Sequence, residues 1–200
     1  MTLIAVTMLR LYDASRDEWR DAIDQRWTAF LGQCALLPLY MPNDPQVSQE
    51  LLERFHPDGV LLTGGGSCQA LTGSADCRDE TEALLLTWAQ QRRLPVLGVC
   101  RGMQVMLARA GARLEPVTAH VGAHDIRYRG TTRRVNSFHD YGFYAAPPGY
   151  EVEAVSEDGV IEAVSHPGAR HSAVMWHPER NPQIDSADLS LVRQVFGVSA

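Results

Sequence analysis

The residue type and setting of Cys100 suggest chemistry. It lies between an apolar run of strand character, 95–99, and an amphipathic helical pattern that begins at Met103, with a glycine two residues to either side. A sharp strand-to-helix turn of this kind presents a side chain at the carboxyl end of a parallel sheet, where the helix N-terminus and Arg101 favour a thiolate. We therefore expect Cys100 to be a nucleophile of low pKa. The alternative is a buried structural cysteine.

A cysteine nucleophile needs a general base within reach and a group that orients this base. His177 follows the strand-like run 173–176, and Glu179 lies two residues further on, where an extended chain directs side chains to the same side. The sequence thus offers Cys100, His177 and Glu179 as nucleophile, base and orienting group. Further histidines are candidate bases by residue type: His120, His124, His139, His166 and His171.

A glycine-rich loop, Gly64-Gly65-Gly66, directly follows the apolar run 60–63. Glycines at the end of a strand let backbone N–H groups approach a ligand, so the loop is a candidate oxyanion hole or phosphate cradle. It lacks the spacing of a dinucleotide site and the lysine of a P-loop. A simple permissive turn remains the alternative.

A metal site is not expected. His120 and His124 have helical spacing, but Gly122 lies between them and no His-Glu-x-x-His pattern is present. We expect these two histidines to line the mouth of the pocket or to be solvated, and we expect no cofactor.

The elements that position these residues alternate along the chain. Apolar runs predict strands at 3–8, 35–39, 60–63 and 95–99, and helical patterns predict helices at 47–55, 79–93 and from 103 to a cap at Gly111. Ser15 followed by Glu18 matches a capping box, which predicts a helix through about Leu31 with Trp19 and Ile23 on its buried face.

Residues 113–176 hold shorter predicted strands between turn clusters, and a helix at 188–196 closes the chain. This order predicts an α/β fold, a doubly wound parallel sheet with helices on both faces and a second set of short strands packed beside it. We expect one domain over residues 1–200.

Composition restricts the partners. The formal net charge of -6 argues against a nucleic-acid binder, and no apolar run approaches the roughly 20 residues of a membrane span. The first eight residues are typical of a strand rather than a signal peptide. We expect a cytoplasmic protein with reduced thiols, a small-molecule substrate, and no membrane partner; a homodimer is one assembly to test.

Three motifs together resemble the class I glutamine amidotransferase superfamily: the segment Gly98 to Gln104, the glycine loop, and Trp176-His177-Pro178-Glu179. Within it the chain is similar to the free-standing γ-glutamyl hydrolases. The segments that support this similarity are 77–82, 134–139 and 158–164. Compact size and the segment 120–124 resemble more closely the γ-glutamyl-CDP-amidate hydrolases of capsule phosphoramidate synthesis.

The resemblance implies a flavodoxin-like fold and hydrolysis of a γ-glutamyl amide through a thioester on Cys100. It implies oxyanion donors at the N–H groups of Gly65 or Gly66 and of Arg101, although the loop lacks the proline or asparagine of many relatives. The substrate contacts that it implies are Gln104, Asn136, Ser137, Phe138, Arg78 and Glu82. A glutaminase subunit that supplies ammonia to a synthase partner is the main alternative, and a non-catalytic binding module is a third.

Four arginines cluster in a segment that the resemblance places near the glutamyl-binding residues: Arg127, Arg129, Arg133 and Arg134. In an acidic protein this local positive charge would suit a leaving group that bears a phosphate or a nucleotide such as CDP. A solvated strand face is the alternative interpretation.

Overall fold

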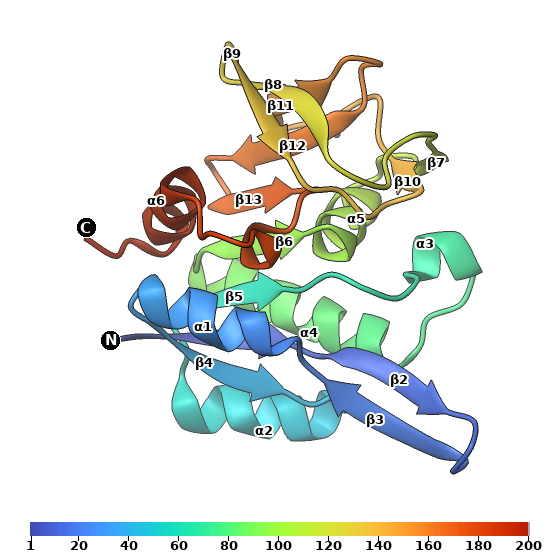
Figure 1. Ribbon diagram of the computed structural model, residues 1–200. Helices are drawn as coiled ribbons and strands as arrows, with labels where there is room; N and C mark the ends of the chain where they lie inside the picture. The colour runs from blue at the N-terminus through green and yellow to red at the C-terminus, as the bar shows by residue number, and fades with distance from the viewer. Residues whose placement is uncertain (200) are drawn as a thin grey trace.

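A single nine-stranded sheet runs through the computed structural model, which describes residues 1–199 (Figure 1). Its strand order is β4-β1-β5-β6-β13-β12-β11-β8-β9. The strands from β4 to β13 are mutually parallel, and those from β13 to β9 are antiparallel neighbours. The strands of this sheet are β1 Thr2–Thr7, β4 Leu36–Met41, β5 Gly59–Leu62, β6 Val96–Val99, β8 His124–Tyr128, β9 Thr131–Val135, β11 Glu151–Ser156, β12 Ile161–His166 and β13 His171–Val174.

Helices cover both faces of the sheet, as the sequence predicts. Two separate hydrophobic cores result: one beneath α1 and α6, the other beneath α2, α4 and α5. The helices are α1 Gln25–Gln33, α2 Pro45–Phe55, α3 Gln69–Thr72, α4 Cys77–Arg92, α5 Arg101–Arg109 and α6 Ser186–Phe196, with a 3-10 turn η1 Pro178–Arg180. The central strands β1, β5 and β6 are buried on both faces, which explains their continuous apolar runs.

The predicted helix from Ser15 to Leu31 is wrong in its first half. Residues 9–22 form an antiparallel hairpin of β2 Leu9–Asp13 and β3 Glu18–Ala22, and α1 begins only after the N-cap Asp24. Trp19 is 56% exposed and stacks beside Tyr12 at 4.9 Å instead of entering the core. The cross-strand aromatic pair stabilises the hairpin, and this nonlocal contact overrides the local capping signal.

The additional strands of the second half also differ from the prediction in one respect. β12, β11, β8 and β9 do not pack beside the parallel sheet but extend it edge to edge beyond β13. Of the described strands in this second half, β7 Glu115–Pro116 and β10 Tyr141–Gly142 form a separate small sheet. The site residues that follow β6 and β13 therefore lie in the middle of one continuous sheet.

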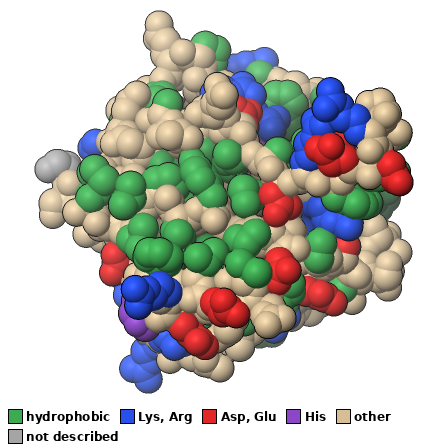
Figure 2. Space-filling model, turned by 90° about the horizontal axis from the view of Figure 1, so that it is seen from below, with side chains coloured by type: hydrophobic (Ala, Val, Ile, Leu, Met, Phe, Trp, Pro, Cys, Tyr) green, Lys and Arg blue, Asp and Glu red, His purple; other side chains and the backbone are tan. Residues whose placement is uncertain are grey.

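A band of hydrophobic side chains crosses the face seen from below, with charged groups around it (Figure 2). The elements on this side in Figure 1 include α2 and the edge strand β4, whose exposed hydrophobic residues are Leu37, Val47 and Phe55. The homodimer stays a prediction. Among the described residues, no helix combines the length and apolar character needed to cross a bilayer.

The turn from β6 into α5 depends on two glycines. A Cβ on Gly102 would lie 2.2 Å from the backbone oxygen of Leu62, and one on Gly98 would lie 2.5 Å from Met106 Sδ. The helix can therefore begin this close to β5 only because neither residue carries a side chain.

Replacing Gly102 with Ala should lower the free energy of unfolding by at least about 1–3 kcal/mol, because a backbone atom must move to admit the methyl group. Urea denaturation measures this loss. The matched control is Gly32→Ala in α1, where nothing lies within 4 Å of the new Cβ; it should leave stability unchanged or raise it by up to about 1 kcal/mol. Equal stability of the two variants would contradict the packing argument.

Candidate active site

Cys100 occupies the turn between β6 and α5 in a strained backbone conformation, with φ 51° and ψ -105°. Its N–H donates to the Val174 carbonyl at 2.8 Å, which ties the turn to the end of β13. The positive φ of a non-glycine residue is typical of a functional site.

The Cys100 side chain is buried, and this burial raises the pKa of the thiol to about 11. The backbone N–H of Arg101 and the charge of Arg180 lower the pKa but do not offset the burial. The expectation of a low pKa for Cys100 is therefore wrong, because burial raises the pKa of the thiol more than the Arg101 N–H and the Arg180 charge lower it. Cys100 holds a neutral thiol at pH 7 and needs a base to ionise it.

His177 and Glu179 lie where the chain leaves β13, next to the end of β6. The two strands are parallel neighbours, with Val174 opposite Val99, so the residues that follow them meet at one sheet edge. His177 Nδ1 and Glu179 Oε1 are 2.7 Å apart, and both side chains are buried.

Cys100 and His177 both lie against Gly64. A Cβ built on Gly64 would lie 3.3 Å from His177 Nε2 and 3.4 Å from Cys100 Cβ. The imidazole edge opposite Glu179 therefore faces the same small space as Cys100 and the first glycine of the loop. The structure thus brings together Cys100, His177, Glu179 and the loop.

Asn136 fixes the backbone of His177. Its Oδ1 accepts from the His177 N–H at 2.8 Å, and its Nδ2 donates to the His177 carbonyl at 2.8 Å. The same amide also donates to Asn181 at 2.8 Å, and Asn181 in turn donates to the buried Asp188. Asn136, expected as a substrate contact, here positions the histidine.

Asp188 anchors this side of the site and was missed by the sequence analysis. Its carboxylate accepts from Trp176 Nε1 at 2.9 Å and pairs with Arg133 at 2.7 Å. Trp176 immediately precedes His177, so the network restrains the strand end from both sides. In the sequence Asp188 is only an acidic residue in the first turn of a predicted helix. Such a residue is expected there from its interaction with the helix dipole alone, so nothing indicated a role in the site.

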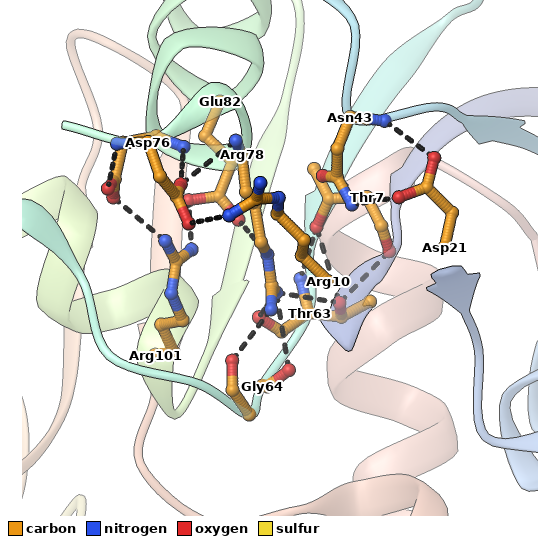
Figure 3. A network of polar contacts seen from close by, with 12 residues as sticks. Thr7, Arg10, Asp21, Asn43, Thr63, Gly64, Asp76, Arg78, Glu82 and Arg101 are labelled. Carbon is orange, nitrogen blue, oxygen red and sulfur yellow. Dashed lines mark hydrogen bonds and ion pairs between the residues drawn. The ribbon is translucent and has the colours of Figure 1, made fainter. Parts of the chain in front are cut away.

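Arg78 extends from α4 and holds the glycine loop (Figure 3). Its guanidinium donates to the carbonyl oxygens of Gly65 at 2.6 Å, Thr63 at 2.9 Å and Gly64 at 3.2 Å. Gly65 and Gly66 adopt φ of 83° and 76°, which a side chain would strain. Arg78 is buried beneath the loop and shapes it rather than facing a substrate.

Glu82 joins the loop support to the elbow. It pairs with Arg78 at 3.0 Å through one carboxylate oxygen and with Arg101 through the other. Arg101 also binds Asp79 at 2.8 Å, and Asp79 completes a capping box with Asp76 at the start of α4. Glu82, expected as a substrate contact, is fully buried in this network. The Arg101 side chain belongs to the same support, so only its N–H is left beside Cys100.

The other expected binding residues differ in accessibility. Gln104 is buried and donates to the Tyr141 carbonyl at 3.0 Å, and Ser137 is buried with its hydroxyl on the His120 carbonyl at 2.5 Å. Phe138 is 49% exposed, and its ring lies 5.6 Å from that of His177. Phe138 is thus the exposed member of the set, and its ring lies beside that of His177.

Three of the four arginines in the expected cluster pair with carboxylates of the chain, while Arg127 is exposed, so binding of an anionic leaving group there stays a prediction. Arg129 pairs with Glu153 at 2.5 Å, Arg133 with Asp185 and Asp188, and Arg134 with Asp125 at 3.2 Å. Their charges are largely compensated within β8, β9 and their neighbours. His120 and His124 differ from expectation: His120 is buried, and both rings pack against the fully buried Glu162.

Comparison with known proteins identifies the family of this chain. The model of the glutamine amidotransferase class-I family matches residues 22–191. A γ-glutamyl-CDP-amidate hydrolase of Campylobacter jejuni is 24% identical over 96% of this chain and 99% of its own length. A γ-glutamyl-γ-aminobutyrate hydrolase of Escherichia coli O157:H7 is 28% identical over 80% of this chain and 78% of its own.

A putative glutamine amidotransferase of Schizosaccharomyces pombe is 27% identical over 61% of this chain and 62% of its own length. Among solved structures, the glutaminase domain of Trypanosoma brucei CTPS superposes with a TM-score of 0.72 at 18% identity, over 100% of this chain and 96% of that one. This likeness confirms the predicted α/β fold. The family match covers most of the chain, and the protein therefore belongs to the class I glutamine amidotransferase family.

Proposed function

We propose that this protein hydrolyses the γ-glutamyl amide bond of a small γ-glutamyl compound and releases glutamate and an amine. The observation that carries the proposal is the convergence of Cys100 and the His177–Glu179 pair on Gly64. A thiol, a base and an oriented base partner at one strand edge are the parts that acyl transfer requires.

In the first half-reaction His177 Nε2 takes the proton of the Cys100 thiol as Sγ attacks the γ-carbonyl carbon. The raised pKa of Cys100 makes this base necessary, because little thiolate exists beforehand. Glu179 accepts from Nδ1–H and stabilises the imidazolium that forms. His177 then gives its proton to the leaving nitrogen, the C–N bond breaks, and a γ-glutamyl thioester of Cys100 remains.

In the second half-reaction water replaces the amine. His177 removes a proton from water, the hydroxide attacks the thioester carbonyl, and the C–S bond breaks to release glutamate. The proton held on Nε2 returns to Sγ, which restores the neutral thiol. The reaction consumes the substrate and one water molecule, and the three side chains return to their starting state.

The oxyanion of each tetrahedral intermediate needs donors beside Cys100. The N–H of Arg101 lies against the thiol, and Arg78 binds the loop through carbonyl oxygens, an arrangement that supports the N–H groups of Gly65 or Gly66 as the second donor. Of the expected contacts, we assign to the glutamyl group Gln104, which lies one helical turn after Cys100, and Phe138, whose ring lies beside that of His177.

Two functions remain candidates within the family. A free-standing hydrolase agrees with the γ-glutamyl-CDP-amidate hydrolase that matches over nearly its whole length, and with our expectation of a small γ-glutamyl compound as substrate. A glutaminase subunit agrees with the close superposition on a glutaminase domain. We favour the hydrolase, because a relative of that name matches over 96% of this chain and 99% of its own length.

The substrate test compares γ-glutamyl-γ-aminobutyrate, a γ-glutamyl amide of a nucleotide phosphoramidate, and glutamine, with glutamate release as the measurement. One of the two larger amides should exceed glutamine in kcat/KM by at least about tenfold, which corresponds to about 1.4 kcal/mol of additional transition-state binding. Equal efficiency on glutamine, with stimulation by a co-purifying synthase, would instead establish the glutaminase function.

The roles of the triad make a graded prediction for that reaction. Cys100→Ala should abolish turnover, His177→Ala should lower kcat by about 10²–10⁴-fold, and Glu179→Gln should lower it less, since the imidazole remains. His56→Asn, at an exposed helix end, is the histidine control and should keep normal rates. Near-normal turnover of His177→Ala would move the base to another histidine.

A further inference from the structure

A second cluster of ionisable side chains lies in the later half of the chain, outside the proposed triad. Glu162 extends from β12, His124 from β8, and His120 and His139 from the loops beside β8 and β9. Glu162, His139 and His120 are 0%, 3% and 4% exposed. A buried carboxylate among three imidazoles needs a partner that compensates its desolvation.

Backbone pairing brings two of these histidines together. The His139 N–H donates to the His120 carbonyl at 3.2 Å, and Val121 and Phe138 form an isolated antiparallel bridge next to them. The His120 and His139 ring centroids are consequently 4.8 Å apart. Backbone pairing, rather than side-chain rotamers alone, therefore holds the two rings next to each other.

Three imidazole nitrogens converge on one oxygen, Glu162 Oε1. The separations are 3.0 Å from His120 Nδ1, 3.3 Å from His124 Nε2 and 3.4 Å from His139 Nε2. Nevertheless, none of these nitrogens and neither Glu162 oxygen has a hydrogen-bond partner of acceptable geometry among the described residues. Six buried or half-buried polar atoms, counting both nitrogens of His124, are left unsatisfied in one small volume.

In two of the histidines, the ring nitrogen that points away from Glu162, here called the outer nitrogen, has a hydrogen-bond partner that defines the tautomer. His120 Nε2 lies 3.2 Å from Asp158 Oδ2, and His139 Nδ1 lies 3.2 Å from the Tyr141 carbonyl oxygen. Both partners only accept, so both outer nitrogens carry the proton. In neutral rings the inner nitrogens then present lone pairs to a carboxylate oxygen, which is itself an acceptor.

Protonating the imidazoles does not remove this clash between acceptor atoms. Protonating both rings would place two imidazolium charges against one carboxylate in a buried site, and one oxygen has too few lone pairs for three donors. A cation among His120, His139 and Glu162, whose inward-facing ligand atoms all lie within 4.8 Å of one another, would satisfy their lone pairs at once, and His124 Nε2 lies 3.3 Å from the same carboxylate oxygen.

We propose that His120, His139 and Glu162, with His124 as the fourth ligand, bind one divalent transition-metal ion, with Zn²⁺ as the best fit. Mixed imidazole and carboxylate ligands suit this ion. Bonds of about 2.0–2.2 Å in a tetrahedron imply ligand-to-ligand distances of roughly 3.3–3.5 Å, close to the separations measured to Oε1. The outer hydrogen bonds from Asp158 and Tyr141 match the way proteins orient metal-binding histidines.

The ion would link segments that the sequence separates widely. It would join the loop at 120, β8, the loop at 139 and β12. Asn136, which grips the backbone of His177, lies three residues before His139. Metal binding therefore stabilises the segment that positions the base, without contributing an atom to the amide chemistry.

The test is direct metal binding by the full chain. After removal of metals with a chelator and dialysis, the protein should take up one equivalent of Zn²⁺, measured by atomic emission, and its melting temperature should rise. Co²⁺ in the same site should give the intense visible absorption of a tetrahedral complex. Both readouts are independent of enzymatic activity.

A variant series localises the ion. Glu162→Gln, which keeps the side-chain volume, should weaken Zn²⁺ binding by more than about 100-fold and abolish the Co²⁺ spectrum. Asp158→Asn, at a more exposed outer partner, should weaken binding by about 10–100-fold and provides the test if the first variant fails to fold. His166→Gln alters a second histidine pair, beside Tyr150 and His171, and should bind as the wild type does.

Three results would overturn the proposal: less than stoichiometric binding by the wild type, equal affinity in Glu162→Gln and the wild type, or an equal loss in His166→Gln. The first would leave the cluster as a set of protonated histidines. The other two would assign the binding to histidines elsewhere on the chain.

Discussion

The close approach of α5 to β5 is the constraint on which the site depends. Gly102 packs against the backbone of Leu62, and Gly98 leaves room for Met106, so the chain turns from strand to helix within two residues. Cys100 adopts a positive φ because the turn is this tight. The strain is sustained by the packing on either side and presents the thiol at the edge where β6 and β13 end.

Two buried polar networks hold the remaining parts around this turn. Arg78, Glu82 and Arg101 connect α4, the glycine loop and the start of α5 (Figure 3). Asn136, with Asn181 and Asp188 behind it, fixes His177 from the other side. Because such groups are costly to bury unpaired, each network specifies one arrangement of its segments. The site is therefore preorganised by residues that do not face the substrate.

Sequence reasoning located the chemistry better than its surroundings. The buried strands β1, β5 and β6 were evident as continuous apolar runs, and strand-end position alone paired Cys100 with His177. The hairpin at 9–22 was mistaken for a helix because a capping signal is local, whereas the Tyr12–Trp19 contact depends on the pairing itself. The thiol pKa, the supporting role of Asn136 and the cluster around Glu162 all depend on burial and on contacts between distant segments, which a single sequence does not encode in any short pattern.

In the proposed reaction Cys100 carries the γ-glutamyl group during turnover. Rapid acid quenching of Glu179→Gln with a γ-glutamyl amide, followed by intact-protein mass spectrometry and peptide mapping, tests it most directly. We expect one glutamyl adduct on the peptide that contains Cys100, labile to hydroxylamine as a thioester is, and no adduct in Cys100→Ser. Glutamate release that continues in a Cys100→Ala variant, or an adduct on a different cysteine, would contradict it.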